Sequence, residues 1–141
     1  MRLQDKVAVI TGAASGIGKE IAIVFAREGA KIAIADLDLK AAEGTARELD
    51  PSGKRAIGVA MDVSDEAQVD AGFAKVVAAF GALDVMISNA AAWADEHFLD
   101  ITVESWRHVL SVDLDAYFVL GNKAARAMKD TGGGVILFTA S

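Results

Sequence analysis

Short apolar runs alternate along the chain with longer segments in which apolar residues recur every three or four positions. The short runs are rich in valine, isoleucine and alanine, which is typical of strands buried on both faces of a parallel sheet. They cover residues 6–11, 31–35, 56–61, 83–88 and 135–139. The longer segments predict helices over residues 17–28, 39–49, 64–80 and 102–129.

The residues at the ends of these segments suit the start or the stop of a helix. Ser64 stands where a side-chain hydroxyl would cap the third helix, and Gly29 and Gly81 stand where the first and third helices should stop. Three consecutive glycines, residues 132–134, separate the last helix from the last strand.

The alternation of strands and helices predicts an α/β fold in which helices cover both faces of a parallel sheet. The expected strand order is 3-2-1-4-5, which is that of a Rossmann-type doubly wound sheet. All-helical and all-antiparallel folds do not explain the short β-branched runs between the helices. A chain of 141 residues has the length of one domain with its own core, so we expect a single domain over residues 1–141.

Composition removes several classes of function. The formal net charge of -6 at pH 7 argues against binding to nucleic acid or to an anionic membrane. The chain has no cysteine, which excludes disulfides, thiol catalysis and cysteine-ligated metals. His97 and His108 show no spacing typical of a metal site, so we expect no metal. The amino terminus lacks the apolar core of a secretory signal and no run is long enough to span a bilayer, so we expect a cytoplasmic protein.

A glycine-rich turn joins the first predicted strand to the first predicted helix. Gly12, Gly16 and Gly18 permit a tight turn and a close approach of the backbone to a pyrophosphate, which the helix N-terminus attracts with its unpaired N–H groups. Asp36 ends the second strand about 20 residues beyond the turn, where a carboxylate binds the adenosine ribose of a dinucleotide. Together these features predict a dinucleotide site. The alternative is a glycine turn beside an unrelated surface aspartate.

Asp36 also favours one cofactor over the other. A carboxylate accepts hydrogen bonds from the ribose hydroxyls of NAD and repels the 2′-phosphate of NADP, which usually needs a nearby cation. The neighbours Ala35 and Leu37 supply no cation, and Lys31 and Lys40 lie too far along the chain. We therefore expect NAD to be the cofactor.

On these residues the chain resembles the short-chain dehydrogenase/reductase family over its whole length. Residues 11–18 match the family's TGxxxGxG loop without a departure. Asp62 and Val63 match the family's adenine-contacting pair, although a helix-capping aspartate before Ser64 is the alternative. The resemblance implies that the loop contacts NAD through Gly12, Ser15, Gly16, Ile17 and Gly18.

A further segment after the fourth strand resembles the family's Asn-Asn-Ala-Gly motif, which supports the sheet and lines the cofactor. Asn89 and Ala90 match the motif, whereas Ser88 and Ala91 depart from it. The resemblance implies that Asn89 and Ala90 contact the cofactor. Ser88 can still form a hydrogen bond, but Ala91 stiffens the backbone where glycine is usual.

The resemblance also implies two catalytic positions. Asp113 lies on an otherwise apolar stripe of the long helix, with Trp106 and Tyr117 on the same face, where the family has a catalytic asparagine. A carboxylate in apolar surroundings needs a partner or a function, so structural and catalytic roles for Asp113 both stay open. Ser141 takes the place of the family's catalytic serine, whose hydroxyl hydrogen-bonds the substrate oxygen.

The family's Tyr-x-x-x-Lys pair, which exchanges the proton with substrate, is absent from these residues. The one tyrosine, Tyr117, is followed four residues later by Gly121 instead of lysine. The resemblance therefore implies an NAD-dependent oxidoreductase acting on a small-molecule alcohol or carbonyl compound. We expect this chain to be its N-terminal portion, with a sheet incomplete on the C-terminal side, and to be inactive alone. A truncated dinucleotide-binding module without catalysis, or an inactive fragment, is the alternative.

Two further expectations concern surfaces. Family members pair through the long helix, so the resemblance implies a homo-oligomer. Trp93 follows the fourth strand on its carboxyl side, where it either lines a substrate cleft or covers the start of the long helix.

Overall fold

Five parallel strands form one sheet in the order β3-β2-β1-β4-β5, which confirms the predicted order. The computed structural model of the chain describes residues 1–140, so the predicted catalytic Ser141 lies outside the described residues. The strands are β1 (Val7–Thr11), β2 (Lys31–Asp36), β3 (Ala56–Ala60), β4 (Val85–Ser88) and β5 (Val135–Phe138).

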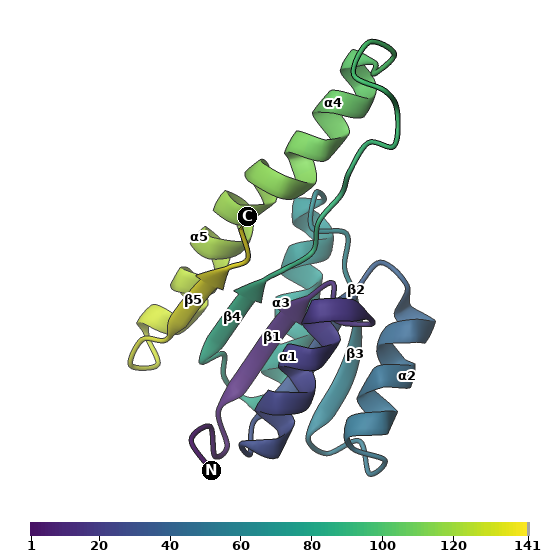
Figure 1. Cartoon of the computed structure of the whole chain (residues 1–141). Coiled ribbons are helices and arrows are strands. Elements are labelled where there is room, and N and C mark those ends of the chain that lie inside the picture. The colour runs from purple at the N-terminus through teal and green to yellow at the C-terminus, as the bar shows by residue number, and fades with distance from the viewer. Residues whose placement is uncertain (141) are drawn as a thin grey trace.

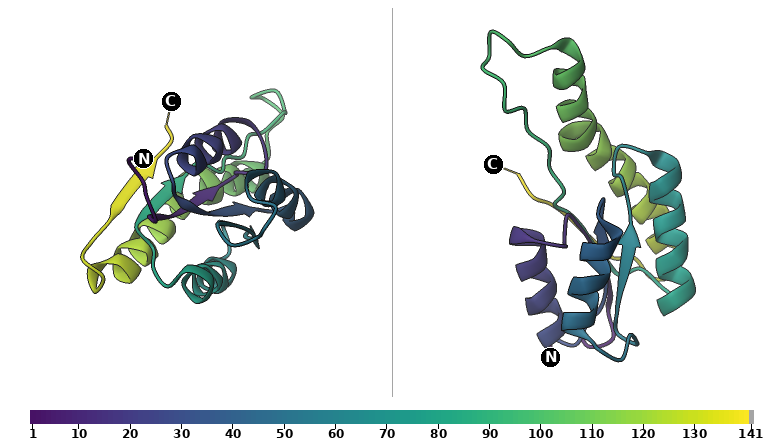
Figure 2. Two further views of the ribbon diagram at one scale, coloured as in Figure 1. Left: turned by 90° about the horizontal axis from the view of Figure 1, so that it is seen from below. Right: turned by 90° about the vertical axis from the view of Figure 1, so that its right-hand side faces the viewer.

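Helices cover the sheet on both sides, so the structure is the predicted doubly wound α/β fold. α1 and α2 lie on one face, and α3 and α5 lie on the other (Figures 1 and 2). The helices are α1 (Gly16–Arg27), α2 (Leu39–Leu49), α3 (Glu66–Phe80), α4 (Val103–Leu110) and α5 (Ala116–Lys129), and a π-helical turn, η1 (Ser111–Asp115), joins the last two.

Alternate residues of each strand enter two separate cores. Val7 and Val9 of β1 pack on the side of α3 and α5, whereas Ala8 and Ile10 pack on the side of α1 and α2. All four are at most 2% exposed. Successive side chains of a strand point to opposite faces, so a strand covered on both faces needs an apolar residue at every position. That requirement explains the continuous apolar runs in the sequence.

The start of α3 differs from the prediction by one residue. Asp65, not Ser64, caps the helix, because its carboxylate accepts a hydrogen bond from the backbone N–H of Ala67 at 2.9 Å. The Ser64 hydroxyl instead donates to the Asp62 carboxylate at 2.6 Å. A charged acceptor at a helix N-terminus is favoured over a hydroxyl that is already engaged elsewhere. Gly81 ends α3 with a φ of +83°, as expected of a glycine stop.

The helix predicted over residues 102–129 forms as one rod, but the π-turn interrupts its periodicity. In η1 the backbone N–H of Ala116 donates to the carbonyl of Ser111, five residues earlier. Such a turn holds one more residue than an α-turn, so the faces before and after it do not align. The predicted continuous apolar stripe is therefore wrong at its start, where Trp106 is 54% exposed. The buried residues of η1 and α5 are Val112, Ala116, Leu120, Ala124 and Met128.

α4 and the loop before it project beyond the carboxyl ends of the strands (Figure 1). α4 has no buried residue. Within residues 1–140, no helix combines the length and the apolar composition needed to cross a bilayer.

Candidate functional site

A cavity of about 470 Å³ lies at the carboxyl ends of the strands, where open α/β sheets bind their ligands. Its wall includes eight of the ten residues predicted to bind NAD, and Gly16 and Gly18 are the two outside it. The lining residues are Gly12, Ser15, Ile17, Asp36, Leu37, Met61, Asp62, Val63, Asn89, Ala90, Ala91, Ala92, Trp93, His108, Val112 and Thr139.

Glycine is needed at the three loop positions for different physical reasons. A Cβ on Gly12 would lie 2.9 Å from the Cα of Ala90, and one on Gly18 would lie 2.4 Å from the carbonyl oxygen of Gly12. These two glycines let the turn pack directly against the end of β4. Gly16 instead has open space around it and a φ of +55°. Its lack of a side chain keeps the approach to the N-terminus of α1 clear for an anion.

Ser15 occupies the N-cap position of α1. Its side chain makes no capping hydrogen bond to the helix. The hydroxyl therefore remains available to a ligand beside the N–H groups of the first turn, which carry the positive end of the helix dipole.

Thr11, the last residue of β1, ties the glycine turn to the loop after β4. Its side-chain oxygen accepts hydrogen bonds from the backbone N–H groups of Asn89 at 2.9 Å and Ala90 at 3.1 Å. The Asn89 side-chain amide donates in return to the carbonyl of Thr11 at 3.1 Å. Thr11 belongs to the matched loop of residues 11–18 but was not among the residues predicted to bind the cofactor. The signal that could have identified it is a polar residue at the end of an otherwise apolar strand. In the structure Thr11 is 1% exposed.

Asp36 lies at the end of β2 with both carboxylate oxygens engaged. One accepts a hydrogen bond from the backbone N–H of Ala14 in the glycine turn at 3.0 Å, and the other accepts from the N–H of Asp38 at 3.2 Å. These contacts fix the direction of the carboxylate at the cavity wall. Each carboxylate oxygen accepts more than one hydrogen bond, so capacity remains for ligand hydroxyls.

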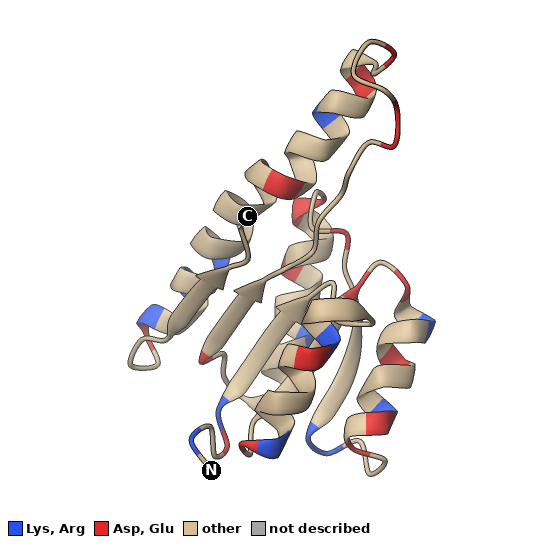
Figure 3. Ribbon diagram, in the orientation of Figure 1, with Lys and Arg blue, Asp and Glu red and all other residues tan. Residues whose placement is uncertain are grey.

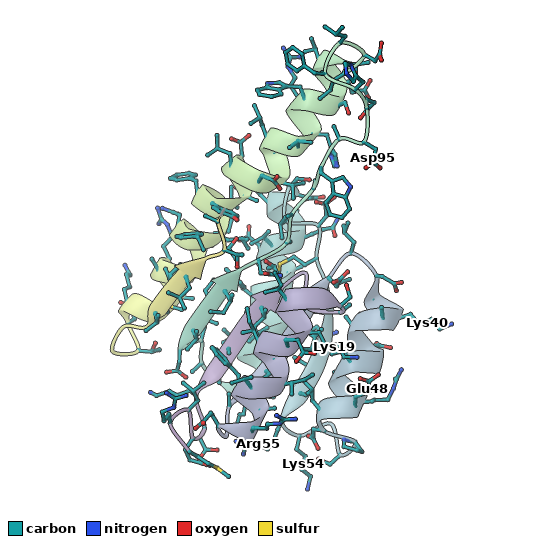
Figure 4. The ribbon with its side chains drawn as sticks, viewed as in Figure 1. Lys19, Lys40, Glu48, Lys54, Arg55 and Asp95 are labelled. Atoms are coloured by element: carbon teal, nitrogen blue, oxygen red, sulfur yellow. The ribbon has the colours of Figure 1, made fainter. Side chains whose placement is uncertain are left out.

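The charges around Asp36 are predominantly negative. Acidic residues occupy the loops at the carboxyl ends of the strands, whereas basic residues gather near the amino terminus (Figure 3). The Lys19 ammonium is paired with Glu48 of α2 at 2.6 Å, and Lys40 extends away from the sheet into solvent (Figure 4). This field favours a ligand with fewer negative charges at this end of the cavity.

Asp62 and Val63 follow β3 on the same side of the sheet. The Asp62 carboxylate accepts hydrogen bonds from the backbone N–H of Ser64 at 2.9 Å and from its hydroxyl. This is a local turn rather than a helix cap, because Asp65 caps α3. Val63 is 6% exposed and belongs to the core beneath the cavity.

Asp113 lies in the π-turn, outside the cavity wall, with a partner. Its carboxylate accepts a hydrogen bond from the backbone N–H of Ala92 at 2.8 Å. The structural role considered for this acid is therefore present as a direct contact between the long helix and the loop after β4. A π-turn at such a position is frequent at functional sites.

Trp93 and His108 both line the cavity. Trp93 is 75% exposed, so it does not bury itself against the start of that helix. His108 comes from α4 and contributes to the same cavity wall. The sequence analysis gave His108 no ligand role, because the projecting α4 that brings it near the loop after β4 leaves no local sequence signal. Among residues 1–140, no group of three or more His, Asp or Glu side chains lies close enough together to hold a metal ion.

Comparison with known proteins identifies a family. Residues 6–141 match the family model described as short chain dehydrogenase. The chain is 39% identical over 142 residues to a sorbitol dehydrogenase of Cereibacter sphaeroides, covering 100% of this chain and 54% of that protein. It is 40% identical over 140 residues to a cis-4-hydroxycyclohexanecarboxylate dehydrogenase of Sinomonas cyclohexanicum, covering 97% of this chain and 55% of that protein.

A solved structure has the same architecture. The crystal structure of 3-ketoacyl-(acyl-carrier-protein) reductase from Brucella melitensis, complexed with NADH, is similar to this chain with a TM-score of 0.92 and 35% sequence identity. The similarity covers 99% of this chain and 58% of that one. The chain thus spans about half the length of the relatives it matches.

Proposed function

The chain belongs to the short-chain dehydrogenase family, and we propose that it forms the NAD-binding part of an oxidoreductase. The reaction is a hydride transfer between the nicotinamide and an alcohol or carbonyl carbon of a small molecule. When bound, the cofactor supplies the hydride chemistry, and the fold supplies binding and orientation. The observation that carries the proposal is the cavity at the carboxyl ends of the strands, which brings together the glycine turn, Asp36 and Asn89.

The residues of the cavity fit a dinucleotide from one end to the other. Asp36 accepts hydrogen bonds from the adenosine ribose, and Asp62 with Val63 borders the adenine. The N-terminus of α1, with Ser15 at the N-cap position, binds the pyrophosphate. Asn89 and Ala90 line the nicotinamide half of the site, and Ser141 holds the substrate oxygen through its hydroxyl.

NAD, rather than NADP, is the proposed cofactor. The carboxylate of Asp36 is oriented by two backbone N–H groups at the wall of the cavity, so a 2′-phosphate would meet a fixed negative charge. Lys19, the cation on the neighbouring turn of α1, is engaged by Glu48. A phosphate at this place would therefore lack the bidentate or ammonium partner that phosphate sites use.

The proposed substrate binds at the mouth of the cavity against Trp93. An exposed indole offers a flat apolar surface to the carbon skeleton of an alcohol, and His108 offers a hydrogen-bonding partner to its polar groups. The named substrates of two relatives, sorbitol and cis-4-hydroxycyclohexanecarboxylate, are alcohols. An alcohol or the corresponding carbonyl compound is the substrate class proposed here.

Titration of the 141-residue chain with NADH and with NADPH tests the cofactor proposal. We expect tighter binding of NADH, and Asp36→Ala should narrow the difference because it removes both the ribose hydrogen bonds and the repulsion. Asp95→Ala is the matched control, since it removes an acid from the loop after β4 (Figure 4) and should leave the preference unchanged. Equal affinity of the unmodified chain for both cofactors would refute the NAD assignment, and binding of neither would refute the cofactor site.

A non-catalytic dinucleotide-binding module is the second candidate for the 141 residues taken alone. Tyr117 is the one tyrosine, Gly121 stands where the family's lysine would follow, and the Tyr117 hydroxyl is bound to the carbonyl of Thr139. A screen of alcohols with NAD, followed by NADH absorbance, separates the candidates. We expect NADH binding without turnover, because lost acid–base catalysis alone costs roughly 10²–10⁴-fold in rate. Robust turnover by the purified chain would show that these residues suffice for catalysis.

Self-association through the long helix is proposed for the assembled protein. Large apolar side chains line the outer side of α4, η1 and α5, away from the core. Val103, Trp106, Leu114 and Phe118 are 65%, 54%, 60% and 74% exposed. Val103 and Trp106 are three residues apart in α4, and Leu114 and Phe118 are four residues apart from η1 into α5, so each pair shares one side of the rod that a second copy of the helix would bury.

A further inference from the structure

Tyr117 connects α5 to the end of β5 through two kinds of contact. Its ring stacks on that of Phe138, with centroids 5.1 Å apart and planes inclined by 27°. Its hydroxyl donates a hydrogen bond to the backbone carbonyl of Thr139. Gly121, one turn later on α5, leaves the room that the Phe138 ring occupies, since an added Cβ would lie 3.1 Å from the Phe138 Cζ. The pair is therefore a fitted contact between the helix and the strand end.

Thr139 is held from the other side by β4. Its backbone N–H donates to the carbonyl of Ser88 at 2.9 Å, and its hydroxyl donates to the side-chain oxygen of Asn89 at 3.3 Å. β5 ends at Phe138, so these bonds, together with that from Tyr117, determine where the chain runs beyond the strand. Thr139 itself lines the cavity.

The same helix also holds the neighbouring loop. Asp113, four residues before Tyr117, binds the backbone N–H of Ala92 after β4. Two polar side chains one helical turn apart thus anchor the two chain segments that border the nicotinamide half of the cavity. Partial burial and the negative charge of Asp113 raise the pKa of Tyr117 above its usual value, so the phenol stays protonated and remains a donor at neutral pH.

We propose that Tyr117 is a positioning residue that fixes the end of β5 at the cavity through Thr139, two residues before Ser141 in the sequence. The proposal rests on the proposed function, because it assigns Tyr117 a part in shaping the site in which nicotinamide and substrate meet. Tyr117 does not exchange a proton in this role. It acts through the Thr139 carbonyl. The Tyr117 hydroxyl holds that carbonyl by a hydrogen bond, in addition to the packing of the ring on Phe138.

A spin label at the strand end tests the hydroxyl separately from the ring. The chain has no cysteine, so Ala140→Cys creates a single site for a nitroxide on an exposed, described residue. Tyr117→Phe in this background keeps the aromatic ring and removes the donor. We expect loss of the immobilised component of the nitroxide spectrum. We also expect weaker quenching of bound NADH fluorescence by the label at equal NADH saturation.

A matched control separates this local effect from general destabilisation. Lys123 of α5 pairs with Asp70 of α3 at 2.7 Å, so its side chain is engaged with α3 and not with β5. Lys123→Gln should lower the unfolding midpoint while leaving the nitroxide spectrum unchanged. An unchanged spectrum in Tyr117→Phe would overturn the proposal, as would the same spectral change in Lys123→Gln. Failure of the parent chain to bind NADH would refute the proposed function alone, because the spectrum still reports the Tyr117 contact.

Discussion

The carboxylate of Asp113 and the backbone N–H of Ala92 are 2.8 Å apart and form a hydrogen bond between the π-turn and the loop after β4. This bond resolves how an acid sits on a largely apolar side of the long helix, since a charged acceptor with an N–H partner avoids the cost of an unpaired carboxylate. In this hydrogen bond the Asp113 side chain acts only as an acceptor. The family's asparagine would offer an acceptor at the same atom and a donor besides.

Asp113 variants test this contact by their stability. Asp113→Asn keeps an oxygen acceptor for the Ala92 N–H and should change the free energy of unfolding little. Asp113→Ala leaves that N–H without its partner and should cost about 1–2 kcal/mol, the range for a lost hydrogen bond to a partly buried group. Urea denaturation of both variants, with Asp115→Asn at an exposed position of the same turn as control, gives the comparison. Equal losses in the Asn and Ala variants would argue against the hydrogen bond as the source.

Two glycines should respond oppositely to the same substitution. A Cβ at Gly18 meets backbone and an amide, at 2.4 Å from the Gly12 carbonyl and 2.8 Å from the Asn89 Nδ2. Gly18→Ala should destabilise the chain by about 1–3 kcal/mol and abolish NADH binding, because the turn must move away from β4. Gly44→Ala in α2 meets open space and should stabilise by about 0.4–1 kcal/mol with NADH affinity unchanged. Thermal unfolding and NADH titration check both, and a tolerated Gly18→Ala would contradict the packing argument.

The sequence predicted the sheet and much of the cavity because those features depend on local patterns. Apolar runs identify the strands, and the positions of Gly12, Asp36 and Asn89 at strand ends bring them to one edge of a parallel sheet. The π-turn was not predictable, because hydrophobic periodicity assumes a uniform helix. Nothing in the sequence around Ser111 indicates that its carbonyl accepts a hydrogen bond from the N–H five residues later. The bonds from Thr11 to Asn89 and from Tyr117 to Thr139 join residues distant in sequence. Which of these residues meet depends on how neighbouring elements align in the fold, and a single sequence does not predict that alignment.

Asp50 carries a prediction about acid stability. Its carboxylate accepts hydrogen bonds from the Ser52 hydroxyl and the Arg55 backbone N–H, both at 2.6 Å, and so holds the turn between α2 and β3. These bonds lower the pKa of Asp50 from 3.8 to about 2, with that from Ser52 the largest cause. Because the folded-state pKa is depressed, the stabilisation is present above pH 3.8 and is lost as the pH falls through about 2.

Carboxyl-carbon NMR titration should find the Asp50 inflection near pH 2. Asp50→Asn should lose the part of the acid-dependent change in stability that this group contributes, and its stability curve should be flatter between pH 4 and pH 2 than that of the unmodified chain. Asp130→Asn, at an exposed carboxylate after α5, is the control for the loss of one negative charge. An ordinary titration of Asp50 would contradict the assigned hydrogen bonds.

The last prediction concerns the uncovered side of β5. Val135 and Leu137 of β5 lie beside Val85 and Ile87 of β4 in the parallel ladder, but only the β4 residues are buried in the core beneath α1 and α2. Val135 and Leu137 are 51% and 52% exposed. β5 is also the edge strand, so its outer backbone groups can pair with another chain.

α1 presents a second exposed apolar surface. Ile17, Ile21, Val24 and Phe25 line a hollow of about 660 Å³ along α1, whose wall also includes Lys19 and Glu20. Exposed apolar faces and open edges recruit other chains, so the 141-residue chain should associate as its concentration rises, despite its net charge of -6. Leu137→Lys should weaken this association, whereas Phe118→Lys should affect only pairing through the long helix. Sedimentation velocity over a range of concentrations distinguishes the two, and a cooperatively folded monomer at high concentration would contradict the prediction and favour a self-sufficient binding module.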